Sequence, residues 1–264
     1  QRRKRFDASG AALPIPKKGK PMPRFFIEET PAGGYITLTG EDAHHLVKVL
    51  RMKPGESLTV CDSAGHDYLC TLEEAAKGAA VCRVHGATAS VGEPGTRVTL
   101  YMGLPKGDKM DFIVQKAVEL GAAEIVPFLA ARSVSRPDGK TLQKKCERWR
   151  KIAREAAMQC GRGLIPAVGE PVSQAQAAVA AAGRDAALFL YENERETGIK
   201  TVLSGKNLHT VALMVGPEGG FAPEEAAAAK EAGMCSVSLG PRILRCETAP
   251  LAALAAVMYE TGNL

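Results

Sequence analysis

Short stretches of alternating apolar and polar residues dominate the chain from about residue 24 to residue 90. Each of these stretches predicts a β-strand, because Gly or Pro turns separate it from the next. They read RFFIEE, GGYITL, ESLTVCD, HDYLCTLEE and AAVCRVHG. One helical stretch interrupts them at 41–51, where Thr39 and Asp42 have the spacing of a capping box. The pattern predicts a small β-barrel over 22–90 and a linker at 91–97, whose Gly-Glu-Pro-Gly cannot continue a strand or a helix.

Apolar strands alternate with helical patterns over 98–264. The strands are predicted at 97–104, 124–128, 185–191, 209–215 and 235–239. The helices are predicted near 108–120, 141–160, 173–182, 223–232 and 250–260. This alternation is typical of a parallel sheet with helices on both faces, so the second domain is predicted to be α/β. On the last predicted helix, Leu251, Leu254 or Ala255, and Met258 form an apolar stripe, which packs either against a second copy or only inside its own domain.

The net charge of +5 changes this picture little, because it is concentrated at one end of the chain. Residues 1–24 carry eight Lys or Arg and one acid, Asp7, so they contribute +7 and leave −2 for the rest. We interpret 1–21 as a basic extension or the remnant of an expression tag. No apolar stretch approaches the length of a membrane span and nothing resembles a secretory signal, so a cytoplasmic enzyme is expected.

Seven cysteines occur without a C-x-x-C spacing. An odd count without that spacing argues against a disulfide framework and against a zinc site, so we expect no metal and reduced thiols in the core.

One predicted helix has an unusual imbalance of charge. Nine basic residues against two acidic ones occur between Arg132 and Arg154. The apolar side chains recur at helical spacing and predict a buried face. They are Leu142, Cys146, Trp149, Ala153, Ala156 and Cys160. Lys144, Arg148 and Lys151 line another face, which is either simply solvated or a surface for a polyanion; the imbalance favours the polyanion slightly.

The ends of three predicted strands indicate a ligand site, since ligands of open α/β sheets bind beyond the carboxyl ends of the strands. These ends are Leu190-Tyr191-Glu192, Val215-Gly216-Pro217 and Leu239-Gly240-Pro241. The second continues into Glu218-Gly219-Gly220, and a helix that opens with two carboxylates follows, which disfavours phosphate. Neither G-x-x-x-x-G-K-[ST] nor a G-x-G-x-x-G after a strand occurs, which argues against a mononucleotide or dinucleotide site at this loop.

Several motifs carry a closer resemblance. LPKGDKMDFIVQKAVELGAAEIVPF (104–128), QCGR (159–162), VGPEGGF (215–221) and SLGPRILRCETAPLAAL (238–254) resemble the RsmE family, SPOUT-class methyltransferases of 16S ribosomal RNA. PRFFIEE (23–29) and EDAHHLVKVLRMKPGE (41–56) match as well. The family usually has Thr where this chain has Cys246, and its members typically begin near Met22.

The resemblance implies a PUA-like β-barrel for RNA, a trefoil-knotted α/β domain that binds S-adenosylmethionine, and a homodimer. It also implies methylation of one uridine at the ring imino nitrogen, which gives 3-methyluridine and belongs to ribosome biogenesis. Two alternatives remain open at this point: a non-catalytic RNA-binding or ribosome-assembly protein, and a methyltransferase for another RNA or base atom. S-adenosylmethionine carries no phosphate, so a glycine loop beside acidic residues suits it.

The motifs and strand ends together predict the site. The catalytic candidates are Arg245, Glu247 and Glu218, because loss of the imino proton needs a carboxylate base and a cation near the carbonyl oxygens. Two structural alternatives stay open: Glu218 caps a loop amide, or Glu247 is a structural partner of Arg245. The predicted cofactor contacts are Leu190, Tyr191, Glu192, Val215, Gly216, Pro217, Glu218, Gly219, Gly220, Leu239, Gly240, Ile243, Leu244, Arg245, Cys246 and Thr248. A branched side chain at Gly219 is expected to fill the space of the ligand. The predicted RNA contacts are Arg24, Arg51, Lys53, Lys106, Lys109, Lys144, Arg148, Lys151 and Arg162.

Overall fold

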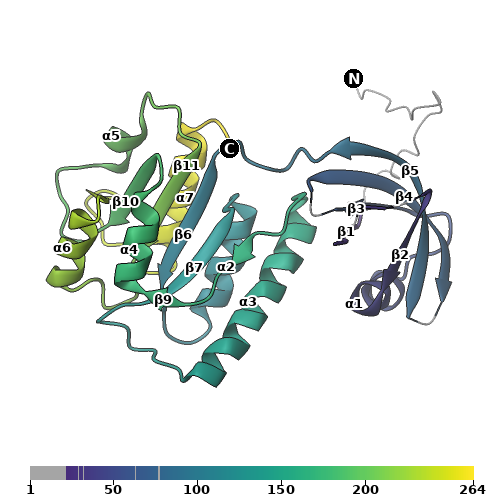
Figure 1. The fold of residues 1–264 in the computed structure, drawn as a ribbon, viewed down its shortest axis with the longest axis horizontal. Helices are drawn as coiled ribbons and strands as arrows, with labels where there is room; N and C mark the ends of the chain where they lie inside the picture. Colours follow the sequence, from purple (N-terminus) through teal and green to yellow (C-terminus); the bar gives the residue numbers. More distant parts are fainter. Residues whose placement is uncertain (1–21, 29, 32, 63, 77) are drawn as a thin grey trace. The chain divides into compact units, whose positions relative to one another are not determined.

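The computed structural model describes residues 22–28, 30–31, 33–62, 64–76 and 78–264, which form two compact units (Figure 1). The first unit extends to Glu93 and also includes Ala157–Ile165. The second consists of Pro94–Ala156 and Pro166–Leu264. The predicted linker at 91–97 spans the change from one unit to the other, whereas nothing in the sequence pattern indicated that 157–165 belongs with the first. The predicted extension at 1–21 lies outside the described residues.

The first unit is built on a five-stranded sheet in the order β1-β3-β4-β5-β2. β1 is parallel to β3, and the other neighbours are antiparallel. The strands are β1 (Arg24–Phe26), β2 (Tyr35–Thr39), β3 (Ser57–Cys61), β4 (His66–Ala76) and β5 (Ala79–Ala89). All five had been predicted from the alternation of apolar and polar residues, and β2 shows why, since only Ile36 and Leu38 point into the core.

The predicted helix of this unit forms as α1 (Gly40–His44), continued by a π-helical turn at His45–Val49. Its Leu46 is fully buried in the core with Phe25, Leu58 and Leu72. The prediction of a capping box was wrong. Thr39 occupies the N-cap position in an extended conformation, but its side chain makes no capping hydrogen bond.

The second unit contains a parallel sheet in the order β12-β10-β11-β6-β7-β8, and β9 also pairs with β7. Its strands are β6 (Arg97–Gly103), β7 (Glu124–Leu129), β8 (Ala167–Val168), β9 (Val172–Ser173), β10 (Ala186–Leu190), β11 (Thr210–Val215) and β12 (Cys235–Val237). The five predicted strands are confirmed to within two residues at each end. The two-residue strands β8 and β9 were not predicted.

Six helices surround this sheet in the described chain: α2 (Lys109–Glu119), α3 (Gly139–Cys160), α4 (Gln174–Ala182), α5 (Ile199–Leu203), α6 (Pro223–Glu231) and α7 (Ala249–Glu260). Figure 1 shows α4 and α6 on one face of the sheet and α7 on the other, where α7 also packs against α2 and α5. Tyr101 faces the α4 side, so its neighbours Leu100 and Met102 face the opposite side. Both faces are therefore covered, as the apolar strands required.

The buried face of α3 agrees with the prediction at four positions, among which Trp149 is buried and donates a hydrogen bond from Nε1 to Asp111 Oδ1 at 3.0 Å. Cys160 is exposed and Cys235 half-buried, so the prediction of core thiols was wrong for these two; the other five cysteines are buried.

Among the described helices, none has the length and apolar character that crossing a membrane requires.

Candidate functional site

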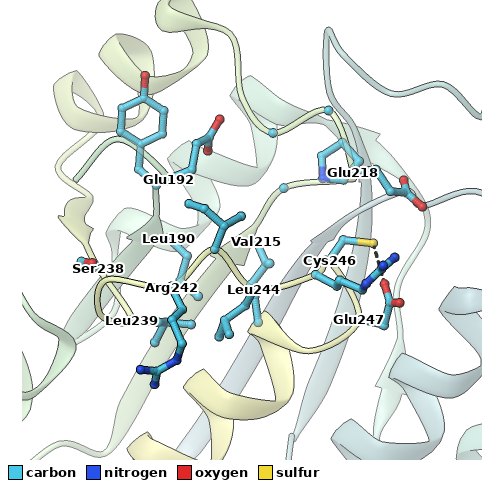
Figure 2. A pocket seen from close by; sticks show the side chains of 18 of the residues that line it. Leu190, Glu192, Val215, Glu218, Ser238, Leu239, Arg242, Leu244, Cys246 and Glu247 are labelled. Carbon is cyan, nitrogen blue, oxygen red and sulfur yellow. Dashed lines mark hydrogen bonds between the residues drawn. The ribbon is translucent and has the colours of Figure 1, made fainter. Parts of the chain in front are cut away.

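A pocket of about 430 Å³ opens where β10, β11 and β12 end in the second unit (Figure 2). Its walls come from the segments 190–195, 215–220 and 237–249, together with Lys109 of α2. Parallel strands bring their carboxyl ends to the same edge of a sheet, which explains why segments distant in sequence meet here. The volume is that of a pocket for a small molecule.

The pocket differs in character from end to end. Figure 2 shows Glu218, Cys246 and Glu247 together at one end. Apolar side chains form the middle: Leu190, Val215, Leu239 and Leu244. Ser238 and Arg242 lie beyond them, away from the Cys246 end. Such a pocket suits a ligand with an apolar ring and charged groups.

Lys109 joins two carboxylates at the first of these ends. Its Nζ donates a hydrogen bond to Glu218 Oε1 at 2.8 Å and lies 3.4 Å from Glu247 Oε2. The backbone N–H of Lys106 also donates to Glu218, at 3.2 Å to Oε1 and 3.3 Å to Oε2. Glu218 therefore fastens the segment before α2 to the loop after β11.

These contacts shift the pKa values of the groups that make them. Burial alone would raise the pKa of the Glu218 carboxyl, but the hydrogen bonds from Lys109 and Lys106 outweigh it and lower that pKa. The pKa of Glu247 is lowered too, first by the hydrogen bond from the Cys246 thiol and also by Lys109. The hydrogen bond to Glu218 raises the pKa of Lys109. At neutral pH both carboxylates are ionised and the lysine is a cation.

Cys246 is a buried thiol rather than a thiolate. Burial raises its pKa to about 12, and the hydrogen bond from Sγ to Glu247 Oε2, 3.2 Å long, acts in the same direction. Lys109 Nζ, 3.7 Å from Sγ, opposes the shift without overcoming it. A thiol in this state is a poor nucleophile at neutral pH.

The segment Gly216–Gly220, which we call the glycine turn, is closely packed from outside. A Cβ on Gly216 would lie 2.9 Å from the Phe221 ring, and one on Gly219 would lie 2.7 Å from the carbonyl oxygen of Arg132. The expectation that a side chain at Gly219 would fill the ligand space was therefore wrong in its reason, since the obstacle is the backbone at Arg132. At Gly220, with φ +64°, a Cβ would meet the Glu192 carboxylate.

The helix that follows the glycine turn uses one of its two early carboxylates for structure. Glu225 accepts a hydrogen bond from the backbone N–H of Ala222 at 2.9 Å, and its other oxygen accepts from Ala131 N–H at 2.7 Å. α6 is thus capped by its own chain, and a negative charge occupies the helix end where an anionic ligand would otherwise bind.

Residues 241–247 of the third wall segment, which we call the arginine segment, are mostly exposed. Ile243 is 72 % exposed, and Arg242 and Arg245 are exposed as well, while Cys246 is buried. Arg245 lines the pocket, but the cation in contact with the two carboxylates is Lys109.

The structure brings together all three catalytic candidates and every predicted cofactor contact except Thr248. Thr248 instead precedes the first residue of α7. The pocket also contains residues that were not predicted to line it: Lys109, Arg195, Val237, Ser238, Arg242 and Ala249. Ser238 and Arg242 lie inside the motif at 238–254, so that motif could have identified them. Arg195 had no comparable signal.

The predicted RNA contacts divide into three groups. Arg51, Lys53, Lys106, Lys144, Arg148 and Lys151 are exposed. Lys109 lines the pocket. Arg24 and Arg162 need correction, because both are largely buried in ion pairs of the first unit, Arg24 with Asp67 at 2.7 Å and Arg162 with Glu93 at 2.6 Å. Their acidic partners occupy the guanidinium groups that were expected to contact phosphate.

Comparison with known proteins assigns the two parts of the chain. Residues 92–258 match the RNA methyltransferase domain family, and residues 38–84 match the RNA methyltransferase PUA domain family. Ribosomal RNA small subunit methyltransferase E of Bacillus subtilis is 38% identical over 92% of this chain and 98% of that protein. The chain belongs to the ribosomal RNA small subunit methyltransferase E family. This confirms the resemblance to RsmE, and with it that the protein is a methyltransferase.

Solved structures of similar proteins confirm the fold of this family member. A Legionella pneumophila protein in complex with the bound cofactor SAM has a TM-score of 0.83 and 31% identity, over 91% of this chain and 98% of that one. Ribosomal RNA small subunit methyltransferase E from Neisseria gonorrhoeae, bound to S-adenosyl methionine, also gives 0.83, at 33% identity over 90% and 97%. The α/β fold with a SPOUT-class methyltransferase domain and a PUA domain is thus confirmed.

Proposed function

We propose that this RsmE family member transfers a methyl group from S-adenosylmethionine to the ring imino nitrogen of one uridine in 16S ribosomal RNA, giving 3-methyluridine. The observation that carries the proposal is the pocket at the ends of β10, β11 and β12, in which ionised carboxylates adjoin an apolar middle. Relatives and solved neighbours named as small-subunit ribosomal RNA methyltransferases support the same substrate class.

The pocket residues fit S-adenosylmethionine in shape and chemistry. Leu190, Val215 and Leu239 offer apolar contact to an adenine, and the backbone of the glycine turn closes one side. Glu192 and Glu218 supply negative charge for hydroxyl and cationic groups. Arg242 and Arg195 supply positive charge for a carboxylate. When bound, S-adenosylmethionine supplies an electrophilic methyl group attached to a sulfonium sulfur.

The protein's own contribution to the reaction is charge placement at the Glu218 end. A uridine imino group is a poor nucleophile until it loses its proton, and Glu247, ionised at neutral pH, is placed to accept it. Glu218 is the weaker candidate for this base, because Lys109 and Lys106 already donate to its oxygens. Arg245 lies on the pocket wall, where its cation stabilises negative charge on the base.

RNA is proposed to contact exposed cations on both units. α3 presents Lys144, Arg148 and Lys151 on its exposed side, of which Arg148 is also paired with Asp111. Arg51 and Lys53 are exposed on the PUA-like unit. Such contacts hold the RNA backbone without selecting its sequence.

The assembly and topology of the protein follow the family in our proposal: a cytoplasmic homodimer with a trefoil knot. Ser238, just after β12, pairs with Gly198, and its N–H donates to Thr197 O at 2.8 Å, which supports a threaded passage beside the loop after β10. The apolar stripe expected for dimerisation needs correction at two positions, because Leu254 and Met258 are fully buried inside their own unit, whereas Leu251 and Ala255 are half-buried. Tyr259, 73 % exposed, lies on the outward side of α7 and is the better candidate for a partner contact.

Nucleoside analysis tests the proposed reaction. Small ribosomal subunits lacking the modification are incubated with the protein and isotopically labelled S-adenosylmethionine, and the digested 16S ribosomal RNA is examined by mass spectrometry. Labelled 3-methyluridine is expected. A label in another nucleoside would contradict the target atom. Calorimetry that shows RNA binding without cofactor binding would instead support a non-catalytic RNA-binding or assembly protein.

A further inference from the structure

Lys109 stands at a position that helix energetics disfavour. It is the first residue of α2, where the helix dipole places partial positive charge, so a cation there costs stability. The chain offsets this with two carboxylates from elsewhere, Glu218 at 2.8 Å and Glu247 at 3.4 Å. A lysine held in an unfavourable place at the wall of a ligand pocket calls for a functional explanation.

The ammonium group of Lys109 has donors left for a ligand. Its three N–H bonds face one close acceptor, Glu218 Oε1, and two longer contacts, Glu247 Oε2 at 3.4 Å and Cys246 Sγ at 3.7 Å. The side chain is 34 % exposed and lines the pocket. A carbonyl oxygen brought to this end can therefore accept a hydrogen bond from Lys109 without breaking its contact with Glu218.

The charged groups around Lys109 keep it a cation. Glu218 faces it from the loop after β11, and Glu247 with the neutral Cys246 thiol faces it from the loop before α7. Arg245 and Arg242 line the same pocket. Lys109 therefore cannot act as a proton acceptor, and its contribution is fixed positive charge.

We propose that Lys109 is a catalytic residue for the acceptor: its ammonium donates a hydrogen bond to a carbonyl oxygen of the target base and stabilises the negative charge left there when the imino proton departs. The inference rests on the proposed function, and it adds a role that sequence motifs did not assign. Glu218 is then a positioning residue that holds Lys109, and Glu247 accepts the proton.

The transfer balances in atoms and charge. The acceptor nitrogen forms its bond to the methyl carbon as the carbon–sulfur bond breaks, and the electron pair of that bond remains on sulfur. The imino proton passes to the Glu247 carboxylate, so one positive and one negative charge disappear together. Lys109 begins and ends as an ammonium, and its effect is to make the acceptor easier to deprotonate.

The test compares Lys109→Met with the wild-type protein in three measurements: the rate of 3-methyluridine formation across pH, S-adenosylmethionine affinity by calorimetry, and folding by circular dichroism. We expect the rate at neutral pH to fall about 100-fold or more, as when a preorganised donor is removed. The rising limb of the pH profile should move to higher pH by about 1 unit or more, because the target uridine must then lose its imino proton without a cation nearby. Cofactor affinity should change little.

Two further variants keep the result interpretable. Lys109→Arg retains the charge and should restore the position of the limb and much of the rate. Lys116→Met removes a half-exposed lysine from the same helix, where it pairs with Glu119 outside the pocket, and should behave as wild type.

Several outcomes would overturn the proposal. One is a Lys109→Met protein whose rate and pH profile are unchanged. Another is a slower Lys109→Met protein whose rising limb has not moved, if Lys109→Arg is just as slow. Failure of Lys109→Met and Lys109→Gln to fold would make the residue a stability element instead. Wild-type protein that forms no 3-methyluridine contradicts the proposed function itself, whereas an active wild type with an unaffected Lys109→Met contradicts only this inference.

Discussion

The two loops that enclose the pocket are built on opposite principles. In the glycine turn there is no room for side chains at two positions. A Cβ on Gly216 would meet the Phe221 ring, and a Cβ on Gly219 would meet the Arg132 carbonyl oxygen. In the arginine segment and the residue before it, space is open: nothing lies within 4 Å of a Cβ built on Gly240, and Ile243 and Arg245 are exposed.

This difference separates two tasks. Because neighbours outside the pocket fix the shape of the glycine turn, that loop is a preformed wall, as cofactor binding without rearrangement requires. The arginine segment keeps large side chains in solvent, where they are available to a molecule other than this chain. We infer that the glycine turn serves the small ligand alone, whereas the arginine segment is divided: Arg242 serves the small ligand and the exposed Arg245 serves the RNA.

The largest effect is expected from Arg245→Ala in the arginine segment. If its guanidinium stabilises charge on the reacting base, methyl transfer should fall about 100-fold or more while S-adenosylmethionine affinity is largely retained. The measurement is the rate of 3-methyluridine formation beside calorimetry with the cofactor. Lys206→Ala, an exposed cation elsewhere in the second unit, is the control. Equal losses of rate and cofactor affinity would show that Arg245 serves the small ligand instead of the RNA.

A pair of glycine substitutions sharpens the contrast in packing. Gly219→Ala should lower the free energy of unfolding by about 1–3 kcal/mol, because the Arg132 backbone has to move, and should weaken cofactor binding. Gly240→Ala meets open space and suffers only from its φ of +105°, a cost of about 1–2 kcal/mol. Denaturant unfolding and calorimetry give both quantities. Cofactor binding that weakens more in Gly240→Ala would reverse the assignment of the two loops.

Salt dependence extends the comparison to the exposed cations of α3. Replacing Lys144, Arg148 and Lys151 together by Gln should reduce the slope of log affinity for RNA against log salt by up to about 2–3 units. The control replaces Lys200, Lys206 and Lys230, which are exposed in the same unit. A slope that changes equally in both triple variants would reflect net charge alone, and an unchanged slope would mean that this face of α3 is only solvated.

Cys246→Thr is expected to have the smallest effect. The thiol, with a pKa of about 12, is neutral at working pH, and a threonine hydroxyl can donate to Glu247 as the thiol does. Most of the methyl-transfer activity should remain. An inactive Cys246→Thr protein that folds and binds the cofactor would show that a covalent adduct through Cys246 is required, and would replace the mechanism proposed above.

The sequence predicted most of the second unit because its strands are buried on both faces and leave unbroken apolar runs. β8 and β9 have two residues each and α5 has five, too short for a period to be recognised. The pocket was predictable as well, since Leu190 and Val215 end parallel strands and Leu239 lies two residues beyond the end of a third.

The errors about charged residues concern contacts between residues far apart in the chain. Lys109 and Glu218 are separated by 109 positions. The sequence around Lys109 therefore predicts a surface lysine, whereas the fold places its cation at the wall of the pocket. Arg24 and Arg162 were taken for phosphate contacts because the acids that bind them, Asp67 and Glu93, lie 43 and 69 positions away. A charge on its own says little about its role until its partner is known.

The strand order of the second unit also governs how this protein is made. β11 lies between β10 and β6, yet it is the last of the three to leave the ribosome. β6 and β10 therefore cannot join through their shared neighbour until the chain has been synthesised past Val215. Asn263, which follows α7, accepts a hydrogen bond from Gly95 N–H at 2.7 Å, just ahead of β6. The strand between β6 and β10 is thus synthesised after both of its neighbours, which exposes apolar strands during translation and favours slow completion.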